Sequence, residues 1–205
     1  MNRDRPLPPE GMEHMSEAQF EPSPDLRLWV QEAFLEEDGP LHNPDHGHLR
    51  RARIGFLWTN VPNAKQGKAV VGTAEIPSSQ GGVWAKARAQ YQLDQWFRGN
   101  LHFLITLDAG YASQCDDIHF AALIDHELYH CAQARDIFNC PRFTKDGDPV
   151  FSLRPHDAEE FVGVVRRYGV GAAASGVAEL VAAAGVTPEI ARIKISQACG
   201  TCLAR

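Results

Sequence analysis

Apolar residues fall into three short stretches that are typical of β-strands. Residues 52–59 and 67–76 predict two strands, and the polar run from 60 to 66 between them has the composition of a turn. Residues 101–107, Leu-His-Phe-Leu-Ile-Thr-Leu, predict a third strand. The chain therefore contains enough strand-forming sequence for one small sheet.

Elsewhere the apolar residues recur every three or four positions, which is the spacing of one helix face. A first helix is expected to open with Ser23 as its cap and Pro24 in its first turn, and to stop at Gly39-Pro40. A helix over 83–98 is expected, and the residues available for its buried face are Trp84, Ala87, Tyr91 and Trp96-Phe97. The other expected helices span residues 114–136, 156–168 and two short segments of the Ala-rich stretch from 169 to 205.

Composition places this chain among ordinary globular proteins. It has 205 residues, of which 44% are hydrophobic and 22% charged, and its net charge is -6. Residues 1–50 hold 11 acidic residues against 4 Lys and Arg, so the acidity belongs to the N-terminal segment. The sequence contains no basic stripe of the kind that binds nucleic acids. Without an apolar signal segment or an 18-residue apolar run, we expect a cytoplasmic protein that does not span a membrane.

Three regions are expected along the chain. Residues 1–23 are rich in Pro, Glu and Ser and predict a disordered N-terminal arm. Residues 24–170 are expected to form the main domain, and residues 171–205 an Ala-rich helical extension. Five cysteines form no disulfide pattern. Cys199 and Cys202 form a single CxxC near the C-terminus, which we interpret as a pair of free thiols.

The predicted helix over 114–136 contains His126-Glu127-Leu128-Tyr129-His130, a His-Glu-x-x-His motif. Histidines four residues apart lie on one face of a helix, one turn from each other, and can hold one metal ion. Glu127 then lies beside the open coordination position, where it can take a proton from water and pass it to a leaving amine. Because the rest of this helix is apolar, a metal site explains the motif better than a surface histidine pair does.

A catalytic zinc usually has three protein ligands, so a third is needed. His156 and Glu160 are four residues apart at the start of the helix expected over 156–168. We favour His156 as the ligand, with Glu160 orienting a ligand imidazole, but the reverse assignment stays open. Asp136 is a weaker candidate on a continuing helix. The three histidines of the segment 42–48 lie in an irregular, solvated stretch, and few such segments bind metal.

The two blocks His126–Cys131 and Arg154–Phe161, followed by Val164-Val165-Arg166-Arg167-Tyr168-Gly169, resemble those of the phage metallopeptidases, which are similar to SprT-like minimal zincins. The resemblance covers roughly residues 25–170. It implies an α+β, zincin-like fold in which a small mixed β-sheet packs on the motif helix with flanking helices. It also implies a zinc-dependent peptidase encoded by a phage or prophage, whose third ligand is a histidine near the start of a later helix.

The function expected from this sequence is hydrolysis of peptide bonds in a peptide or protein substrate, with Zn²⁺ as cofactor and Glu127 as general base. The strand over 101–107 is expected to be the edge strand that accepts an extended substrate. Two alternatives stay open. One is a non-catalytic, zinc-stabilised phage structural or host-interaction module. The other is a SprT-like protease that acts on DNA-associated proteins, although this chain shows no basic surface for DNA.

Overall fold

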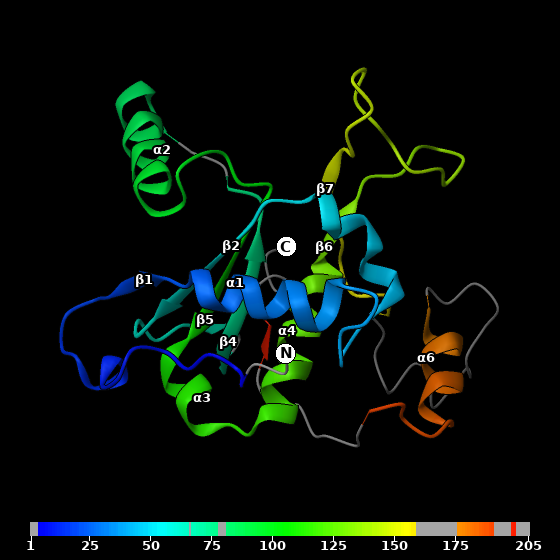
Figure 1. Cartoon of the computed structure of the whole chain (residues 1–205), viewed down its shortest axis with the longest axis horizontal. Coiled ribbons are helices and arrows are strands. Elements are labelled where there is room, and N and C mark those ends of the chain that lie inside the picture. Colours follow the sequence, from blue (N-terminus) through cyan, green and yellow to red (C-terminus); the bar gives the residue numbers. More distant parts are fainter. Residues whose placement is uncertain (1–3, 66, 78–80, 159–175, 191–197, 200–205) are drawn as a thin grey trace. The chain divides into compact units, whose positions relative to one another are not determined.

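The structure is a computed structural model of the chain (Figure 1), and it describes residues 4–65, 67–77, 81–158, 176–190 and 198–199. The chain divides into two compact units, Met1–Arg154 with Ile195–Arg205, and Pro155–Lys194. In the second unit, helix α6 (Val177–Ala184) follows Gly176, whose left-handed backbone lies too close to Asp157 for any side chain. The sheet and the motif helix belong to the first unit.

The first unit is built on a mixed sheet with the strand order β1-β2-β5-β4-β3, and β8 lies beside β4. β2 and β5 are parallel, whereas β4 is antiparallel to β5. The strands of this sheet are β1 (Phe20–Pro22), β2 (Ile54–Thr59), β3 (Ala64–Lys65), β4 (Lys68–Glu75), β5 (Phe103–Asp108) and β8 (Ala198–Cys199). The three predicted strands are therefore confirmed as β2, β4 and β5, and the α+β class with a small mixed sheet is confirmed as well.

The prediction that residues 101–107 form the edge strand is wrong. β5 pairs along its length with β2 on one side and with β4 on the other, so it is a central strand. Its sequence shows why: Phe103, Leu104, Ile105 and Leu107 are all buried, which is typical of a strand covered on both faces. β4 takes the place nearer the edge.

The described helical elements of the first unit run from η1 to α4 in chain order. α1 (Pro24–Val30) begins at Ser23, whose hydroxyl accepts the backbone N–H of Leu26, as its sequence predicted. The remaining helical elements are the π-helical turn η2 (Gln31–Leu35), the 3₁₀ helices η1 (Met12–His14) and η3 (Pro44–Arg51), α2 (Val83–Phe97), α3 (Ala109–Gln114) and α4 (Asp117–His130). Among the described helices, none has the length and hydropathy needed to cross a bilayer.

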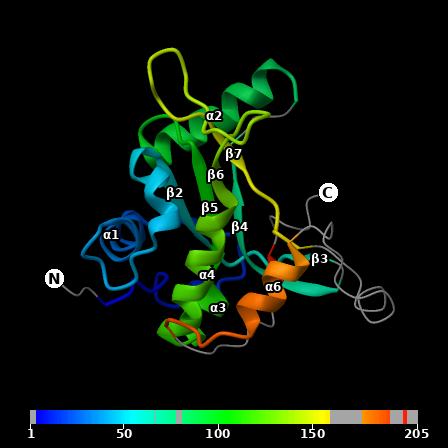
Figure 2. The same cartoon turned by 90° about the vertical axis from the view of Figure 1, so that its right-hand side faces the viewer.

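The core fixes α4 against the sheet. The ring of Phe120, which lies in α4, is 6.0 Å from the ring of Trp29 in α1 and 6.0 Å from that of Trp58 in β2. Leu123, Ile124 and Leu128 continue this buried stripe along α4. Figure 1 and Figure 2 show α1 and α4 packed on the sheet, consistent with these ring contacts. This apolar stripe thus anchors α4 against the sheet, and Glu127 is buried on the same side of the helix as Leu123.

α4 ends at His130, earlier than the predicted end near residue 136. The next residues form β6 (Cys131–Gln133), which pairs with β7 (Phe151–Leu153) in an antiparallel ladder. The chain between them turns near Gly147, whose left-handed backbone suits a tight turn. Strand pairing with a segment 20 residues away has overridden a local sequence that could continue the helix.

Two other segments differ from the sequence predictions. The described part of the predicted disordered arm packs on the domain, because Met12 is buried in the core and β1 pairs with β2. Helix α2 forms as predicted, but Trp84 and Tyr91 are exposed, at 89% and 65%. Only its C-terminal end, at Trp96 and Phe97, reaches the body of the unit.

Candidate metal centre

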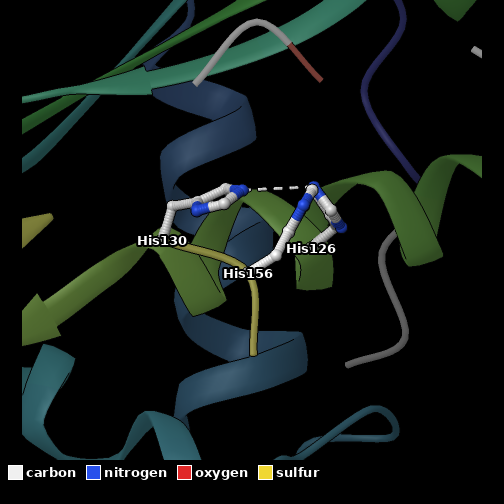
Figure 3. Close-up of side chains that lie close together, drawn as sticks. All are labelled: His126, His130 and His156. Carbon is white, nitrogen blue, oxygen red and sulfur yellow. Dashed lines mark hydrogen bonds between the residues drawn. The ribbon is translucent and has the colours of Figure 1, made fainter. Parts of the chain in front are cut away.

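The two histidines of the motif face each other on α4. The helix begins at Asp116, whose carboxylate accepts the backbone N–H of His119 at 2.8 Å. One turn separates His126 from His130, and their Nε2 atoms are 3.2 Å apart (Figure 3). Two imidazole nitrogens on one tetrahedral zinc would be about 3.3 Å apart, given Zn–N bonds of about 2.0–2.1 Å. The pair is therefore spaced to share one metal ion.

His130 is held by the backbone of Arg154. Its Nδ1 donates to the carbonyl oxygen of Arg154 at 2.7 Å, and the N–H of Arg154 donates back to the carbonyl oxygen of His130 at 2.9 Å. Since a carbonyl can only accept, Nδ1 carries the hydrogen, and Nε2 has the lone pair that a metal requires. The ring is buried, with 2% of its surface exposed, so this orientation is fixed.

His156 follows Arg154 by two residues, so chain connectivity brings it to the same place. Ring nitrogens of His126, His130 and His156 lie within 4.8 Å of one another, and Figure 3 shows the three side chains together. Within the described part of the chain, no other group of three potential metal ligands is found. The structure thus brings together the three histidines that the sequence singled out. Glu160, the alternative ligand, lies outside the described residues.

Glu127 is fully buried and points toward the sheet rather than toward solvent. Strand β4 passes over it at Gly72, where a Cβ atom would lie 2.8 Å from Oε1 of Glu127 and 3.0 Å from Cδ1 of Leu123. Only glycine leaves room for the carboxylate at this crossing. The sequence analysis missed Gly72, although a glycine inside the strand pattern Val-Val-Gly-Thr-Ala indicates a close backbone approach.

The weaker candidates lie apart from this cluster. Asp136 is exposed, and its Oδ1 accepts the backbone N–H groups of Phe138 and Cys140, each at 2.9 Å, so it shapes a loop. In the segment 42–48, the prediction of a solvated stretch is wrong for His46, which is 1% exposed. Its Nε2 lies 2.7 Å from Oδ1 of Asp125, a residue of the motif helix. No histidine of this segment belongs to the described metal-binding group.

Cys131, directly after the motif, is unsuited to metal binding. It is fully buried, and burial together with the nearby Glu127 carboxylate holds the pKa of its thiol well above the usual range. The thiolate, which is the form that binds metal, is therefore disfavoured. Of the CxxC pair, Cys199 lies in β8 and Cys202 lies outside the described residues.

An α+β domain with a His-Glu-x-x-His helix packed on a mixed sheet is the architecture of a small zincin-like metallopeptidase. Comparison with family models agrees with this class. The chain belongs to the phage metallopeptidase family, because the model described as "Putative phage metallopeptidase" matches residues 27–185. The match extends beyond residue 170, where the resemblance in the sequence was expected to end. Neither the comparison with curated proteins nor that with solved structures gave a match.

Proposed function

We propose that this protein is a zinc-dependent peptidase in which His126, His130 and His156 hold the metal and Glu127 acts as general base. The observation that carries the proposal is the 3.2 Å separation of the Nε2 atoms of His126 and His130, with a nitrogen of His156 within 4.8 Å. Three imidazoles with an open fourth position are a ligand set typical of catalytic zinc. Family membership supports metal-dependent peptide hydrolysis as the reaction.

When bound, zinc supplies Lewis acidity, which polarises the substrate carbonyl and makes water acidic enough to react near neutral pH. The protein supplies the proton transfers. Glu127 would take a proton from the attacking water while the water oxygen bonds to the carbonyl carbon. The same carboxyl group would then give that proton to the amine nitrogen as the carbon–nitrogen bond breaks. Its complete burial favours this role, since Glu is rarely buried without a specific purpose.

The substrate in this proposal is an extended peptide that adds to β4, in place of the strand over 101–107 considered from the sequence. β4 is the strand that passes over Glu127, at Gly72. Its outer edge also accepts a strand, because β8 pairs with it in parallel, with Ala198 opposite Val70 and Cys199 opposite Gly72. An edge that takes a short strand from its own chain can take one from a peptide through the same main-chain hydrogen bonds.

The test compares the parent protein with Glu127→Gln and His126→Ala, using elemental analysis and cleavage of a peptide library. We expect about one zinc per parent chain and its loss in His126→Ala. Glu127→Gln should keep the metal and lose at least the roughly 10²–10⁴-fold that general-base catalysis supplies. A non-catalytic module predicts metal without cleavage in both the parent and Glu127→Gln. Cleavage by Glu127→Gln at the parental rate would refute the assigned base.

A further inference from the structure

The motif helix is contacted by a segment that lies far from it in the sequence. This segment, residues 43–48, lies in and just before η3 and contacts α4 through side chains on both sides. The contacts fall on Asp125 and Tyr129, which are four residues apart and share one helix face, and on the backbone of Cys131. In the motif these positions stand immediately before His126, immediately before His130 and immediately after His130.

The face of Asp125 and Tyr129 is bound by three side chains of the segment. Nε2 of His46 lies 2.7 Å from Oδ1 of Asp125, and the rings of His46 and Tyr129 meet edge to face at 4.7 Å. The hydroxyl of Tyr129 donates to Oδ2 of Asp45 at 2.9 Å. The amide of Asn43 reaches both helix residues, with Nδ2 3.2 Å from Oδ1 of Asp125 and 3.1 Å from the Tyr129 hydroxyl.

A further contact lies at the helix end. Nε2 of His48 lies 2.7 Å from the carbonyl oxygen of Cys131, so it donates to one of the carbonyls that a helix leaves without an intrahelical partner. His48 thereby fixes the backbone where α4 passes into β6. Successive residues of a helix point about 100° apart, so all of these contacts lie beside the face of His126 and His130 and leave that face open.

The chemistry of His46 indicates a role beyond stability. Its side chain is buried, and its Nδ1 has no hydrogen-bond partner among the described residues. Burying an imidazole with one nitrogen unsatisfied costs free energy that an apolar residue of similar size would not. His46 offsets this cost with a directed hydrogen bond to Asp125, which precedes the proposed metal ligand His126 by one residue.

We propose that residues 43–48 form a positioning element of the metal centre, with His46 as its central residue. The element holds the C-terminal end of α4, from Asp125 to Cys131, so that the imidazoles of His126 and His130 keep the separation that one metal ion needs. This inference rests on the proposed function for the identity of the ligands. It assigns a role at the metal centre to residues that lie outside the His-Glu-x-x-His motif.

The test measures metal affinity by competition with a chelator, and the visible spectrum of the cobalt-substituted protein, without any assay of activity. His46→Ala removes the bond to Asp125, and His46→Gln retains an N–H that can replace Nε2–H. Tyr129→Phe, at a more exposed site, removes the bond to Asp45 with little risk to folding. His42→Ala is the matched control, because no side-chain hydrogen bond of His42 is found within the described residues.

We expect His46→Ala to weaken metal binding about tenfold, the lower end of the range for residues that orient ligands, and to alter the cobalt spectrum. Tyr129→Phe should weaken binding less, His46→Gln should restore most of the affinity, and His42→Ala should bind like the parent. Parental affinity and spectrum in folded His46→Ala and Tyr129→Phe would overturn the inference. A parent protein that binds no metal would instead overturn the proposed function, so the two failures are distinguishable.

Discussion

Gly72→Ala is the substitution that tests the position of Glu127 most directly. The added Cβ would lie 2.8 Å from Oε1 of Glu127, whereas ordinary contact begins at 3.4 Å, so the carboxylate must move by about 0.6 Å. The atom that must move is the far end of a flexible side chain. The backbone at Gly72 needs no left-handed conformation, so the strand itself can accept alanine. We therefore expect a displaced carboxylate in a protein that still folds.

The two effects of Gly72→Ala can be estimated separately. Replacing glycine by alanine stabilises a compatible site by about 0.4–1 kcal/mol through the unfolded chain, which offsets part of the crowding at Leu123. We expect the melting temperature to change by no more than about 4 °C. A misplacement of about 1 Å can cost about 10²-fold in rate, so a 0.6 Å shift should lower kcat roughly tenfold or more. Zinc content should not change, because the three atoms nearest to the added Cβ belong to Glu127 and Leu123 and not to a proposed ligand.

The assay is steady-state cleavage of a fluorogenic peptide, with thermal melting and zinc content measured on the same samples. Gly82→Ala is the control, since a Cβ at Gly82 meets nothing within 4 Å. The sharper test is a double-mutant cycle. If Gly72→Ala acts by displacing the carboxylate, it should have little further effect on cleavage in a Glu127→Gln background. An unchanged kcat in folded, metal-loaded Gly72→Ala would refute the reasoning.

Three further predictions concern the ligands, the thiols and the C-terminal strand. His156→Ala should nearly abolish zinc binding, while Glu160→Gln should weaken it by roughly 10–100-fold, and zinc titration of both variants would reveal the opposite ranking if Glu160 is the ligand. Iodoacetamide should label the exposed Cys140 in the native protein and leave the buried Cys131 unmodified, as peptide mass mapping can check. Deleting residues 195–205 should lower KM for extended peptides, because β8 then no longer occupies the edge of β4, and an unchanged KM would argue against substrate binding there.

Elements whose signals are local were predictable from the sequence. β2, β4 and β5 lie within two residues of the expected strands, and α1 has the cap that Ser23 indicated. What periodicity could not reveal is which element covers a given face. The apolar spacing of α2 is real, yet Trp84 and Tyr91 are exposed, because a helical pattern specifies a stripe and not its partner.

The residues of the candidate site also fall into two groups, those that a local pattern reveals and those whose roles depend on long-range contacts. His126, Glu127 and His130 could be found because an i,i+4 pair is a local pattern. Gly72 and His46 could not be assigned in this way, since their roles depend on contacts with α4 that span 55 and 79 residues of sequence. A glycine within a strand and a histidine beside Asn-Pro-Asp were both visible in the sequence, but their partners were not.

The third histidine shows how long-range pairing completes a local motif. The residues after His130 are good helix formers, and a continuing helix would have carried the chain past the metal face. Instead Cys131 begins β6, and its pairing with Leu153 of β7 places Arg154 beside His130. The carbonyl of Arg154 then orients the His130 ring, and two further residues of chain bring His156 within reach. The early end of α4 is therefore a condition for the three-histidine group, because it lets one strand pair both orient the second histidine and deliver the third.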